Sequence, residues 1–488
     1  MPIKLDKPTD EQVKIYEAFE RARAKEEPSF AVDAKAGSGK TSTAVASVDA
    51  FPKNSAMVAF NKSIADELVQ RLGGRVPAST FHSLGFSHLR DRISGCRSDL
   101  YKISDLCRNK FKWGFAYRPY ANVIEHIMTN GIGIDVQEEL TFESTYLDAM
   151  GYSDTNLPEG MELPTFLGRC QELMFAMLED NTRVCFPEML YKPLYLSARN
   201  KWNLERYSTL IIDEAQDVSP VRLMLASQTA KNLIPIGDPC QSIYGFAGAV
   251  TGAFDVMCDK YQMKRYTLST SWRCSRAVII QAQQIVGPCI FHREDAEQGH
   301  VGHLSQDEFY PMPADSNDFI LCRTNAPLFK LAMQFVKQNR AFQLRSDFTE
   351  RLLGLARKLA KESQGKATMF TAIDEWCKEQ VEIYAEAKGV VRRIEEQADC
   401  LQVVLQMSDS IEDMLFNLEM LLNSEVGPIL MTIHKSKGLE AKRVFLIRPD
   451  YLPAPWVDPF DEEELEQERN LHYVAVTRAI SDFYYVEE

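Results

Sequence analysis

The chain has 488 residues, which is enough for about three or four domains of ordinary size. Apolar residues make up 45% of it and charged residues 25%, a composition typical of a soluble globular protein. The net charge of −14 argues against a protein coated in positive charge, so any nucleic-acid site must depend on particular residues and on stacking.

The 11 cysteines are scattered and form no CxxC pair, so the sequence predicts neither a zinc site nor an iron–sulfur cluster. An odd number of dispersed thiols suits a reducing compartment better than a secreted protein. The first residues are polar, and no long apolar run occurs anywhere in the chain. We therefore expect neither a signal peptide nor a membrane span.

The N-terminal region opens with a capping-box pattern at Thr9, which predicts a helix that runs to about Lys25. On this interpretation Gln12, at the third helical position, serves only the cap. Further along, residues 55–60 are typical of a short buried strand, and Asn61 caps a helix that follows it.

Between these elements, residues 30–43 read FAVDAKAGSGKTST. An apolar run leads into a glycine-rich turn that ends in Gly39-Lys40-Thr41, and helix formers follow. A strand, a glycine turn and a helix N-terminus in this order form a phosphate cradle, because the free amides of the first helical turn point at the anion. We expect Lys40 to reach the β- and γ-phosphates and the Thr41 hydroxyl to hold Mg²⁺. The strict pattern has glycine where Ala34 stands, and the alternative is a turn before an ordinary helix.

A third strand is predicted at residues 76–80, so strands alternate with helices, which predicts a parallel α/β sheet. Ligands of such sheets bind at the carboxyl ends of the strands. Polar or aromatic side chains stand at these ends on the side of the phosphate loop: Phe60, Asn61, Thr80 and His82.

Two adjacent acids follow the next strand, which is predicted at residues 208–212. Asp213 is expected to bind Mg²⁺ through water, and Glu214 to orient or deprotonate the attacking water. An acidic loop after a strand is also a common solvated feature, but its pairing with the lysine loop favours a nucleotide site.

A further strand, predicted at residues 232–237, leads to Gln241 and then to Tyr244 and Phe246. A polar amide beside a nucleotide site, followed by aromatic residues, suggests a sensor joined to a stacking platform. The alternative for Phe246 is an ordinary core aromatic.

A second α/β pattern begins after residue 268. Its predicted strands lie at residues 319–322, 341–344, 429–433 and 443–447, and its predicted helices include 328–338 and 462–479. One phosphate loop with two α/β patterns suggests that a single nucleotide is bound between the two α/β regions. Such a site needs cations from the second pattern, and Arg273 and Arg478 are the candidates.

Amphipathic helical segments dominate residues 85–206 and 347–426, which we interpret as insertions. The predicted organisation is a first ATP-binding α/β domain at residues 1–84 plus 207–268, a helical insertion at 85–206, a second α/β domain at 269–346 plus 427–488, and a short helical insertion at 347–426.

Eight segments, in order, resemble the motifs of the UvrD/Rep/PcrA family of superfamily 1 helicases. They are AKAGSGKT (34–41, for AGAGSGKT), FNKSIADEL (60–68, for FTNKAA), STFHSL (79–84, for TFHGL), IIDEAQD (211–217, for VDEFQD), IGDPCQSIYGFAGA (236–249, for VGDDDQSIYSWRGA), SWRCS (271–275, for NYRSS), MTIHKSKGLE (431–440, for MTIHSAKGLE) and ERNLHYVAVTRA (468–479, for ERRLAYVGVTRA).

The resemblance implies an α/β fold with two RecA-like parallel-sheet motor domains of the P-loop NTPase class, each carrying a helical insertion. It implies ATP and Mg²⁺ as cofactors and single-stranded DNA as the bound polymer. It assigns catalytic roles to Lys40, Asp213, Glu214, Gln241, Arg273 and Arg478, and Mg²⁺ ligation to Thr41 and Asp213. It assigns ATP contacts to Gln12 (adenine), Ala36, Gly37, Ser38, Gly39, Lys40, Thr41, Trp272 (stacked on adenine), Arg273, Glu440 (ribose) and Arg478. It assigns DNA contacts to Phe60, Asn61, Thr80, His82, Tyr244, Phe246, Thr432 and His434.

The sequence also departs from the family pattern. Phe246-Ala247 replaces Trp-Arg, which makes the stacking surface smaller and removes one cation, and Pro239-Cys240 replaces two acids. The second insertion is about as short as a single small domain, where the family usually has a much larger one. We therefore leave the strength of duplex unwinding open.

The function we expect is an ATP-dependent helicase or translocase on single-stranded DNA and its junctions with duplex, which the family implies moves 3′→5′. The first alternative is a translocase that displaces proteins with little unwinding, and the second is an ATP-gated DNA-binding subunit. We expect a nucleic-acid-associated protein of the cytoplasm of a bacterial or phage-infected cell, with replication or repair proteins as possible partners and no membrane contact.

Overall fold

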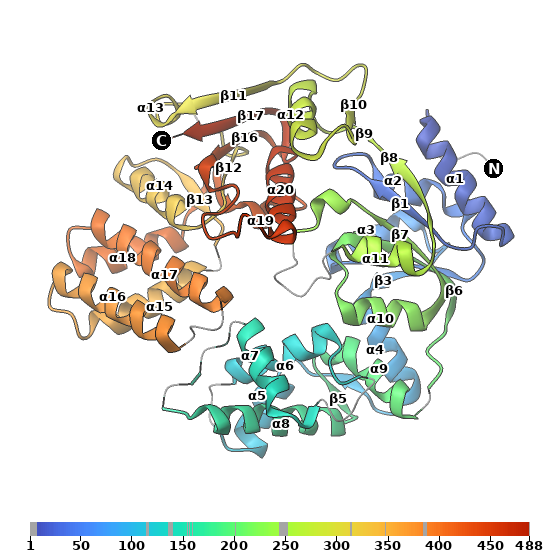
Figure 1. Ribbon diagram of the computed structural model, residues 1–488, viewed down its shortest axis with the longest axis horizontal. Helices are drawn as coiled ribbons and strands as arrows, with labels where there is room; N and C mark the ends of the chain where they lie inside the picture. The colour runs from blue at the N-terminus through green and yellow to red at the C-terminus, as the bar shows by residue number, and fades with distance from the viewer. Residues whose placement is uncertain are drawn as a thin grey trace. The chain divides into compact units, whose positions relative to one another are not determined.

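The computed structural model describes residues 7–113, 117–134, 140–153, 155, 157–158, 160–200, 202–243, 252–312, 315–346, 348–383 and 388–487 (Figure 1). The chain forms two compact units. The first comprises Met1–Lys35 and Gly39–Ser269, and the second comprises Ala36–Ser38 and Thr270–Glu488. Among the described helices, none is long and apolar enough to cross a membrane.

The first unit is built on a parallel sheet whose strands have the order β3-β2-β6-β7-β1-β8 in the described part of the chain. The strands are β1 (Phe30–Ala34), β2 (Ser55–Ala59), β3 (Ala78–Thr80), β6 (Tyr207–Asp213), β7 (Ala230–Gly237) and β8 (Lys264–Leu268). The central strands are buried along almost their whole length, as expected when helices cover both faces of a parallel sheet. The alternation of strands and helices therefore predicted this sheet correctly.

Helices flank this sheet and supply its core. They are α1 (Asp10–Ala24), α2 (Lys40–Ala46), α3 (Lys62–Leu72), α10 (Pro220–Thr229) and α11 (Ala253–Lys260). The predicted N-terminal helix is confirmed, with the capping box formed between Thr9 and Gln12. In the core, the Phe19 ring lies 5.0 Å from the Phe30 ring and 4.6 Å from the Phe51 ring. These contacts pack α1 against the strand that leads into the phosphate loop.

The segment between β3 and β6 is mainly helical, as predicted. Its elements are α4 (Phe81–Arg92), β4 (Arg97–Ser98), α5 (Lys102–Asp105), the π-helical turn Leu106–Lys110, α6 (Arg118–Asn130), α7 (Glu143–Tyr152), α8 (Leu163–Glu179), β5 (Arg183–Val184) and α9 (Glu188–Asn200). Tyr120 of α6 is buried against Phe166 of α8, so this aromatic belongs to the core. The helical pattern begins at Phe81, before the predicted start of the insertion at residue 85, because Thr80 caps α4.

The second unit contains a sheet with the order β11-β17-β16-β12-β15-β13-β14 in its described residues. The strands are β11 (His300–Ser305), β12 (Phe319–Cys322), β13 (Phe342–Leu344), β14 (Glu425–Val426), β15 (Ile429–Thr432), β16 (Ala441–Ile447) and β17 (Ala479–Glu487). All neighbours pair in parallel except β13 and β14. The second α/β pattern is thereby confirmed.

Two sequence predictions need correction here. The helix predicted at residues 462–479 ends at Val476, and Ala479 begins β17, a strand that the sequence analysis missed. Ala479 pairs with Ala441 of β16, so a long-range sheet contact outweighs the helical propensity of these residues. The strand predicted at 429–433 ends at Thr432, because Ile433 begins the short helix α19 (Ile433–Ser436).

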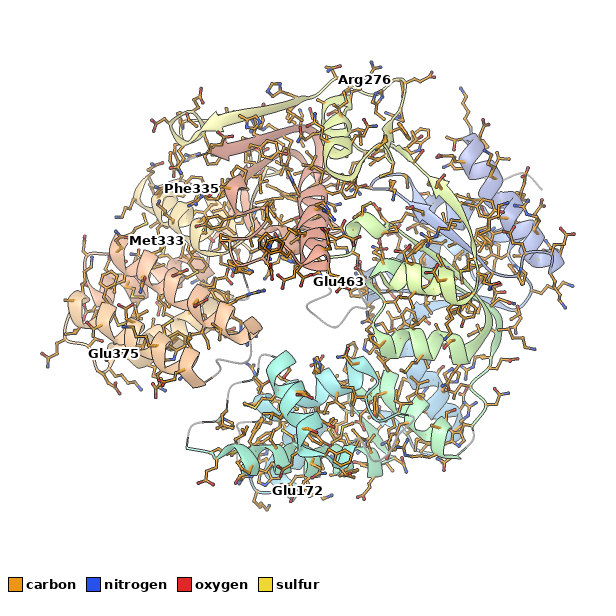
Figure 2. The ribbon with its side chains drawn as sticks, in the orientation of Figure 1. Glu172, Arg276, Met333, Phe335, Glu375 and Glu463 are labelled. Atoms are coloured by element: carbon orange, nitrogen blue, oxygen red, sulfur yellow. The ribbon has the colours of Figure 1, made fainter. Side chains whose placement is uncertain are left out.

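The other helices of the second unit cover the sheet and build a helical layer from residues 348–422. They are α12 (Arg276–Val286), α13 (Gln306–Phe309), α14 (Ala326–Lys337), α15 (Phe348–Ala360), α16 (Lys366–Ile383), α17 (Lys388–Met407), α18 (Ile411–Leu422) and α20 (Glu462–Val476). Met333 and Phe335 of α14, labelled in Figure 2, share one buried core with Leu353, Leu401 and Met414 of this layer. The proposed division of each unit into a sheet domain and an insertion stays a prediction.

Candidate nucleotide-binding site and nucleic-acid interface

The phosphate loop follows β1 and leads directly into α2. Gly37 and Gly39 have φ values of 69° and 81°, a left-handed conformation that side chains with a Cβ adopt only at a cost. Gly39 is the N-cap residue of α2, and Lys40 and Thr41 form the first helical turn. The local sequence therefore folds as the strand, glycine turn and helix that it predicts.

Lys40 and Thr41 contact the two acids that follow β6. The Lys40 Nζ lies 2.7 Å from the Glu214 Oε2, and the Thr41 hydroxyl donates to the Asp213 Oδ2 over 3.0 Å. Burial opposes the charge of Lys40, but Glu214 and Asp213 outweigh it and raise the pKa of Lys40. Glu214 has a φ of 52°, a strained backbone of the kind that occurs at functional sites. The two halves of the predicted site are thus joined within one unit.

Asp213 and Thr41 fit a magnesium ion by their chemistry. Both present oxygen atoms, the donor type that Mg²⁺ prefers, and these oxygens are adjacent. Burial, and next the charge of Glu214, raise the pKa of Asp213 to about 6, so the carboxyl is ionised at neutral pH. Mg²⁺ is commonly held by one or two carboxylates together with substrate phosphates, which agrees with this small set of ligands.

Gln216 is a site residue to which the sequence analysis gave no role. Its Nε2 donates to the Glu214 Oε2 over 2.7 Å, and its Oε1 accepts from the Asp238 backbone amide over 3.1 Å. A Cβ added at Gly237 would lie 2.4 Å from the Gln216 Oε1, so a larger residue there would displace the Gln216 amide. Gln241 in turn donates through Nε2 to the Asp238 Oδ2 over 2.8 Å. Gln216 therefore connects Glu214 to the loop that carries Gln241.

Gln12 is buried, and both ends of its side-chain amide have partners. Its Oε1 accepts from the Thr9 backbone amide over 2.9 Å, which closes the capping box. Its Nε2 donates to the Thr43 hydroxyl over 3.2 Å, on the helix that begins at the phosphate loop. The adenine contact stays a prediction.

The loop residues Ala36–Ser38 cluster with the second unit. The Ala36 amide donates to the Tyr473 hydroxyl over 3.1 Å, and the Trp272 amide donates to the Gly37 carbonyl over 2.8 Å. A Cβ at Gly37 would lie 2.7 Å from the Cβ of Arg273, so a side chain does not fit at this position.

The second unit presents an exposed indole side chain. The next residue in the sequence is a cation that pairs with a carboxylate. The Trp272 ring is 46% exposed, and the Arg293 guanidinium lies 5.1 Å from its centroid. The Arg273 Nε lies 2.6 Å from the Glu440 Oε2. An exposed indole with a cation near it can carry a stacked base. The sequence analysis missed Arg293, because no local motif marks it.

Arg478 is fully buried within the second unit. Its Nε donates to the Val474 carbonyl over 3.0 Å, and its Nη1 donates to the Leu439 carbonyl over 3.1 Å. The side chain is thus bound to the end of α20 and to the segment before Glu440. Its predicted contact with a γ-phosphate remains a prediction.

Aromatic and cationic side chains gather at the carboxyl ends of β2 and β3. The Arg222 guanidinium lies 4.5 Å from the Phe60 ring centroid, and the His82 ring stacks on the Phe186 ring with centroids 3.7 Å apart. Burial, and then Arg222, lower the pKa of His82 to about 3, so the ring is neutral at physiological pH. We call these four residues the aromatic cluster. Phe186 and Arg222 were missed, since neither lies within a motif.

Two of the other predicted DNA contacts cap helices with their side chains. The Asn61 side chain accepts from the Ile64 amide, and the Thr80 hydroxyl accepts from the Ser83 amide, so both cap helices. Thr432 is the N-cap residue of α19. Burial, followed by nearby cations, lowers the pKa of His434 to about 3. Tyr244 and Phe246 lie outside the described residues, and all these DNA contacts stay predictions.

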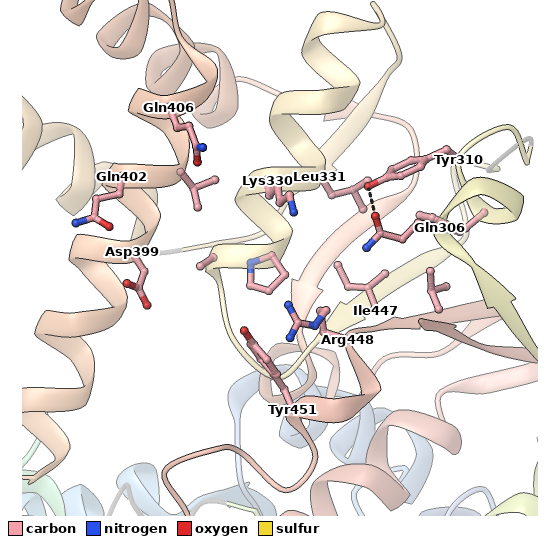
Figure 3. Close-up of a pocket in the computed structure, with 15 residues that line it drawn as sticks. Gln306, Tyr310, Lys330, Leu331, Asp399, Gln402, Gln406, Ile447, Arg448 and Tyr451 are labelled. Carbon is pink, nitrogen blue, oxygen red and sulfur yellow. Dashed lines mark hydrogen bonds between the residues drawn. The ribbon is translucent and has the colours of Figure 1, made fainter. Parts of the chain in front are cut away.

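A separate cavity of about 300 Å³ lies in the second unit, between α14, α17 and the end of β16 (Figure 3). Its walls include Lys330, Asp399, Arg448 and Tyr451, and none of the residues predicted for the nucleotide or DNA sites lines it. Burial raises the pKa of Asp399. The cavity is therefore distinct from the sites described above.

A glycine-rich loop after one parallel strand, joined to two adjacent carboxylates after another strand of the same sheet, defines the class of P-loop nucleotide hydrolases. The chain matches the family model of the UvrD/REP helicase N-terminal domain over residues 17–262 and that of the UvrD-like helicase C-terminal domain over residues 205–486. It therefore belongs to the UvrD-like helicases, a family of ATP-dependent hydrolases.

Three relatives illustrate the similarity. The chain is 24% identical over 482 residues to F-box DNA helicase 1 of Gallus gallus, which covers 91% of this chain and 46% of that protein. It is 25% identical over 498 residues to F-box DNA helicase protein 1 of Schizosaccharomyces pombe, covering 92% and 54%. It is 22% identical over 611 residues to a probable DNA helicase II homolog of Rickettsia felis, covering 92% and 89%. The chain thus spans about half the length of the F-box relatives and most of the bacterial one.

Proposed function

We propose that this protein is an ATP- and Mg²⁺-dependent motor that moves along single-stranded DNA, in the 3′→5′ direction, and separates duplex at junctions. The observation that carries the proposal is the pairing of Lys40 with Glu214 and of Thr41 with Asp213 at one edge of a parallel sheet. Membership in the helicase family supports DNA as the bound polymer. The geometry of the nucleotide site alone fits any P-loop hydrolase.

The residues of the first unit divide the chemistry among them. Lys40 would exchange Glu214 for the β- and γ-phosphates, and the carboxylate so released would orient or deprotonate the attacking water. A magnesium ion held by Thr41 and Asp213 would neutralise charge on the phosphates. Gln216 holds Glu214 by a hydrogen bond, so the carboxylate keeps its direction when the lysine leaves.

The second unit would supply further cations to the same phosphates. The family resemblance supports Arg273 and Arg478 for this role, and an arginine of this kind contributes about 10³–10⁵ in rate. If hydrolysis depends on such residues, it requires closure between the two α/β units, and that requirement would couple ATP turnover to movement.

The aromatic cluster of Phe60, His82, Phe186 and Arg222 is the part of the described surface that we propose for single-stranded DNA. Phe186 is 50% exposed and Phe60 is 36% exposed, so both rings can accept a base. The Arg222 guanidinium lies over the Phe60 ring and places a cation beside these two exposed aromatic residues. Stacking on aromatic rings tolerates every base, as a motor that moves along a strand requires.

Phe186→Ala is expected to weaken single-strand binding by about 1–3 kcal/mol, which is the usual contribution of one stacked base. The measurement is fluorescence anisotropy of a labelled oligothymidine at fixed salt. Phe142→Ala is the matched control, because Phe142 is also an exposed phenylalanine of the first unit (58%) but lies outside the cluster. Equal affinities of the two variants would remove Phe186 from the interface.

A translocase that displaces proteins with little unwinding is the second candidate. The alignment with the Rickettsia felis relative runs over 611 positions, more than the 488 residues of this chain, so that relative has segments that this chain lacks. In this chain the described residues between β13 and β14 form the helical layer α15 to α18. A smaller region there favours weaker action on duplex.

ATP hydrolysis with and without single-stranded DNA, beside unwinding of duplexes with a 3′ or a 5′ tail, separates these functions. The proposed function requires hydrolysis that DNA stimulates and unwinding from the 3′ tail only. Stimulation without unwinding would favour the translocase. DNA binding that ATP alters, with negligible turnover, would indicate the ATP-gated subunit. Lys40→Ala serves as the control, because it removes the phosphate contact and is expected to abolish turnover in every assay.

A further inference from the structure

Lys35 is a buried cation that the function described above does not use. It follows β1 directly, and its side chain is 6% exposed. In the motif AKAGSGKT it stands where the family pattern AGAGSGKT has glycine. A buried lysine in place of glycine requires partners, because burial of an unpaired charge is costly.

The partners of Lys35 lie on its own strand and on the loop after β7. Its Nζ lies 2.8 Å from the Asp33 Oδ1, 3.6 Å from the Asp238 Oδ1 and 3.6 Å from the Cys240 sulfur. Burial opposes its charge, but Asp238 and Asp33 outweigh burial and raise the pKa of Lys35. The lysine is therefore a permanent cation held between two carboxylates.

The Asp238 carboxylate contacts both Lys35 and Gln241. One carboxylate oxygen, Oδ1, faces Lys35 and accepts from the Cys240 amide over 3.2 Å, while the other, Oδ2, accepts from the Gln241 Nε2 over 2.8 Å. Asp238 is fully buried, so its carboxylate has a fixed orientation. Its backbone amide also donates to Gln216, which in turn holds Glu214.

We propose that Lys35 is a positioning residue, which fixes the carboxylate of Asp238 and thereby the side-chain amide of Gln241 beside the nucleotide site. The inference rests on the proposed function and on the family resemblance, which implies that Gln241 links the γ-phosphate to DNA. Lys35 touches neither substrate. It sets the direction of an amide that must detect a phosphate, and it joins the entry of the phosphate loop to the loop of Gln241. Loss of the cation removes one of the contacts that orient Asp238, and so weakens the positioning of the Gln241 amide.

The test compares Lys35→Met with Lys14→Met, the same change at an exposed lysine of α1. Lys35→Met is expected to lower the kcat of DNA-stimulated ATP hydrolysis about tenfold, while KM and the affinity for a fluorescent ADP analogue stay within about twofold. A structural role alone would change binding and turnover together. If Lys35→Met does not fold, Lys35→Gln, which keeps a hydrogen-bond donor, takes its place in every assay.

A double-variant cycle shows whether Lys35 acts through Gln241. If it does, Lys35→Met in the background of Gln241→Ala lowers the stimulated kcat no further than Gln241→Ala alone. Additive losses would overturn the inference, as would a normal stimulated kcat of Lys35→Met beside an impaired Gln241→Ala. A normal stimulated kcat of Gln241→Ala itself would instead overturn the role of Gln241 in the proposed function, and the inference with it.

Discussion

Glu214→Gln is expected to lower the kcat of ATP hydrolysis by about 10²–10⁴-fold, the usual contribution of a general base. The glutamine keeps the size of the side chain and can still accept a hydrogen bond from Gln216, but it cannot take a proton from water. The strained backbone at this position is independent of the side-chain charge, so the fold is retained. Steady-state hydrolysis with saturating single-stranded DNA measures the effect.

Nucleotide binding should survive this change. Lys40 loses the carboxylate with which it pairs, so it becomes more available to phosphates. We therefore expect the variant to bind an ATP analogue at least as tightly as the parent. Glu67→Gln, at an exposed glutamate of α3 that pairs with Arg71, is the matched control and should retain full turnover. A parental kcat for Glu214→Gln would assign the base to another residue.

Glu188→Gln is expected to destabilise the helical region of the first unit by about 3–5 kcal/mol, the cost of breaking a buried ion pair. Glu188, Lys102 and Lys192 all have fully buried side chains. The Lys102 Nζ lies 2.7 Å from the Glu188 Oε1, and the Lys192 Nζ lies 3.5 Å from the same oxygen. Without the carboxylate, two ammonium groups remain buried side by side.

The two lysines also cap the end of α8, so removal of the carboxylate that neutralises their charge is costly. The Nζ of Lys102 and the Nζ of Lys192 both donate to the Met177 carbonyl, over 2.9 Å and 3.0 Å. Lys192 also donates to the Asp180 carbonyl over 2.7 Å. Hydrogen exchange of the backbone amides in α8 and α9 measures the local effect, since the chain has two units. Glu67→Gln, which breaks an exposed pair, should cost less than about 1 kcal/mol by the same measurement on α3.

The pH dependence of the Glu188→Gln variant follows from Lys192. Burial, above all, lowers the pKa of this lysine in the folded chain even beside Glu188, and removal of the carboxylate lowers it further. The unfolded chain then binds the proton that the folded chain releases, so stability rises with pH below the ordinary lysine pKa of 10.5. The difference in free energy of unfolding between the variant and the parent should therefore become smaller as the pH rises toward this value. A constant difference in stability would mean that Lys192 keeps its proton in the folded variant.

Elements that depend on local interactions were predicted well from the sequence. The capping box at Thr9 begins α1, and Asn61 caps α3 (Lys62–Leu72), the helix that was expected to follow it. The phosphate loop is equally local, because its glycines alone adopt the required backbone without strain. The pairing of Lys40 with Glu214 could also be expected, since both follow strands that end at the same edge of a parallel sheet.

Contacts set by packing between distant segments could not be predicted. Residues 477–480 suit a helix locally, yet Ala479 begins β17, because pairing with β16 satisfies its backbone within a buried sheet. Residues such as Phe186 and Glu188 belong to no motif. The sequence around an isolated aromatic or acidic residue does not show whether its side chain is exposed or buried. Their roles appear only when folding stacks Phe186 on His82 and encloses Glu188 with two lysines.

The sequence by itself determined the class of the protein, the order of its motifs and the local form of the phosphate loop, because glycine turns, helix caps and strand ends are encoded within a few neighbouring positions. The tertiary structure alone decided which side chains hold the residues of the candidate site in place. Lys35 and Asp238 are 203 positions apart, and only the adjacency of β1 and β7 in the sheet brings their charges together. Electrostatic pairing acts through space, so the partner of a buried charge is fixed by the fold and not by its neighbours in the chain.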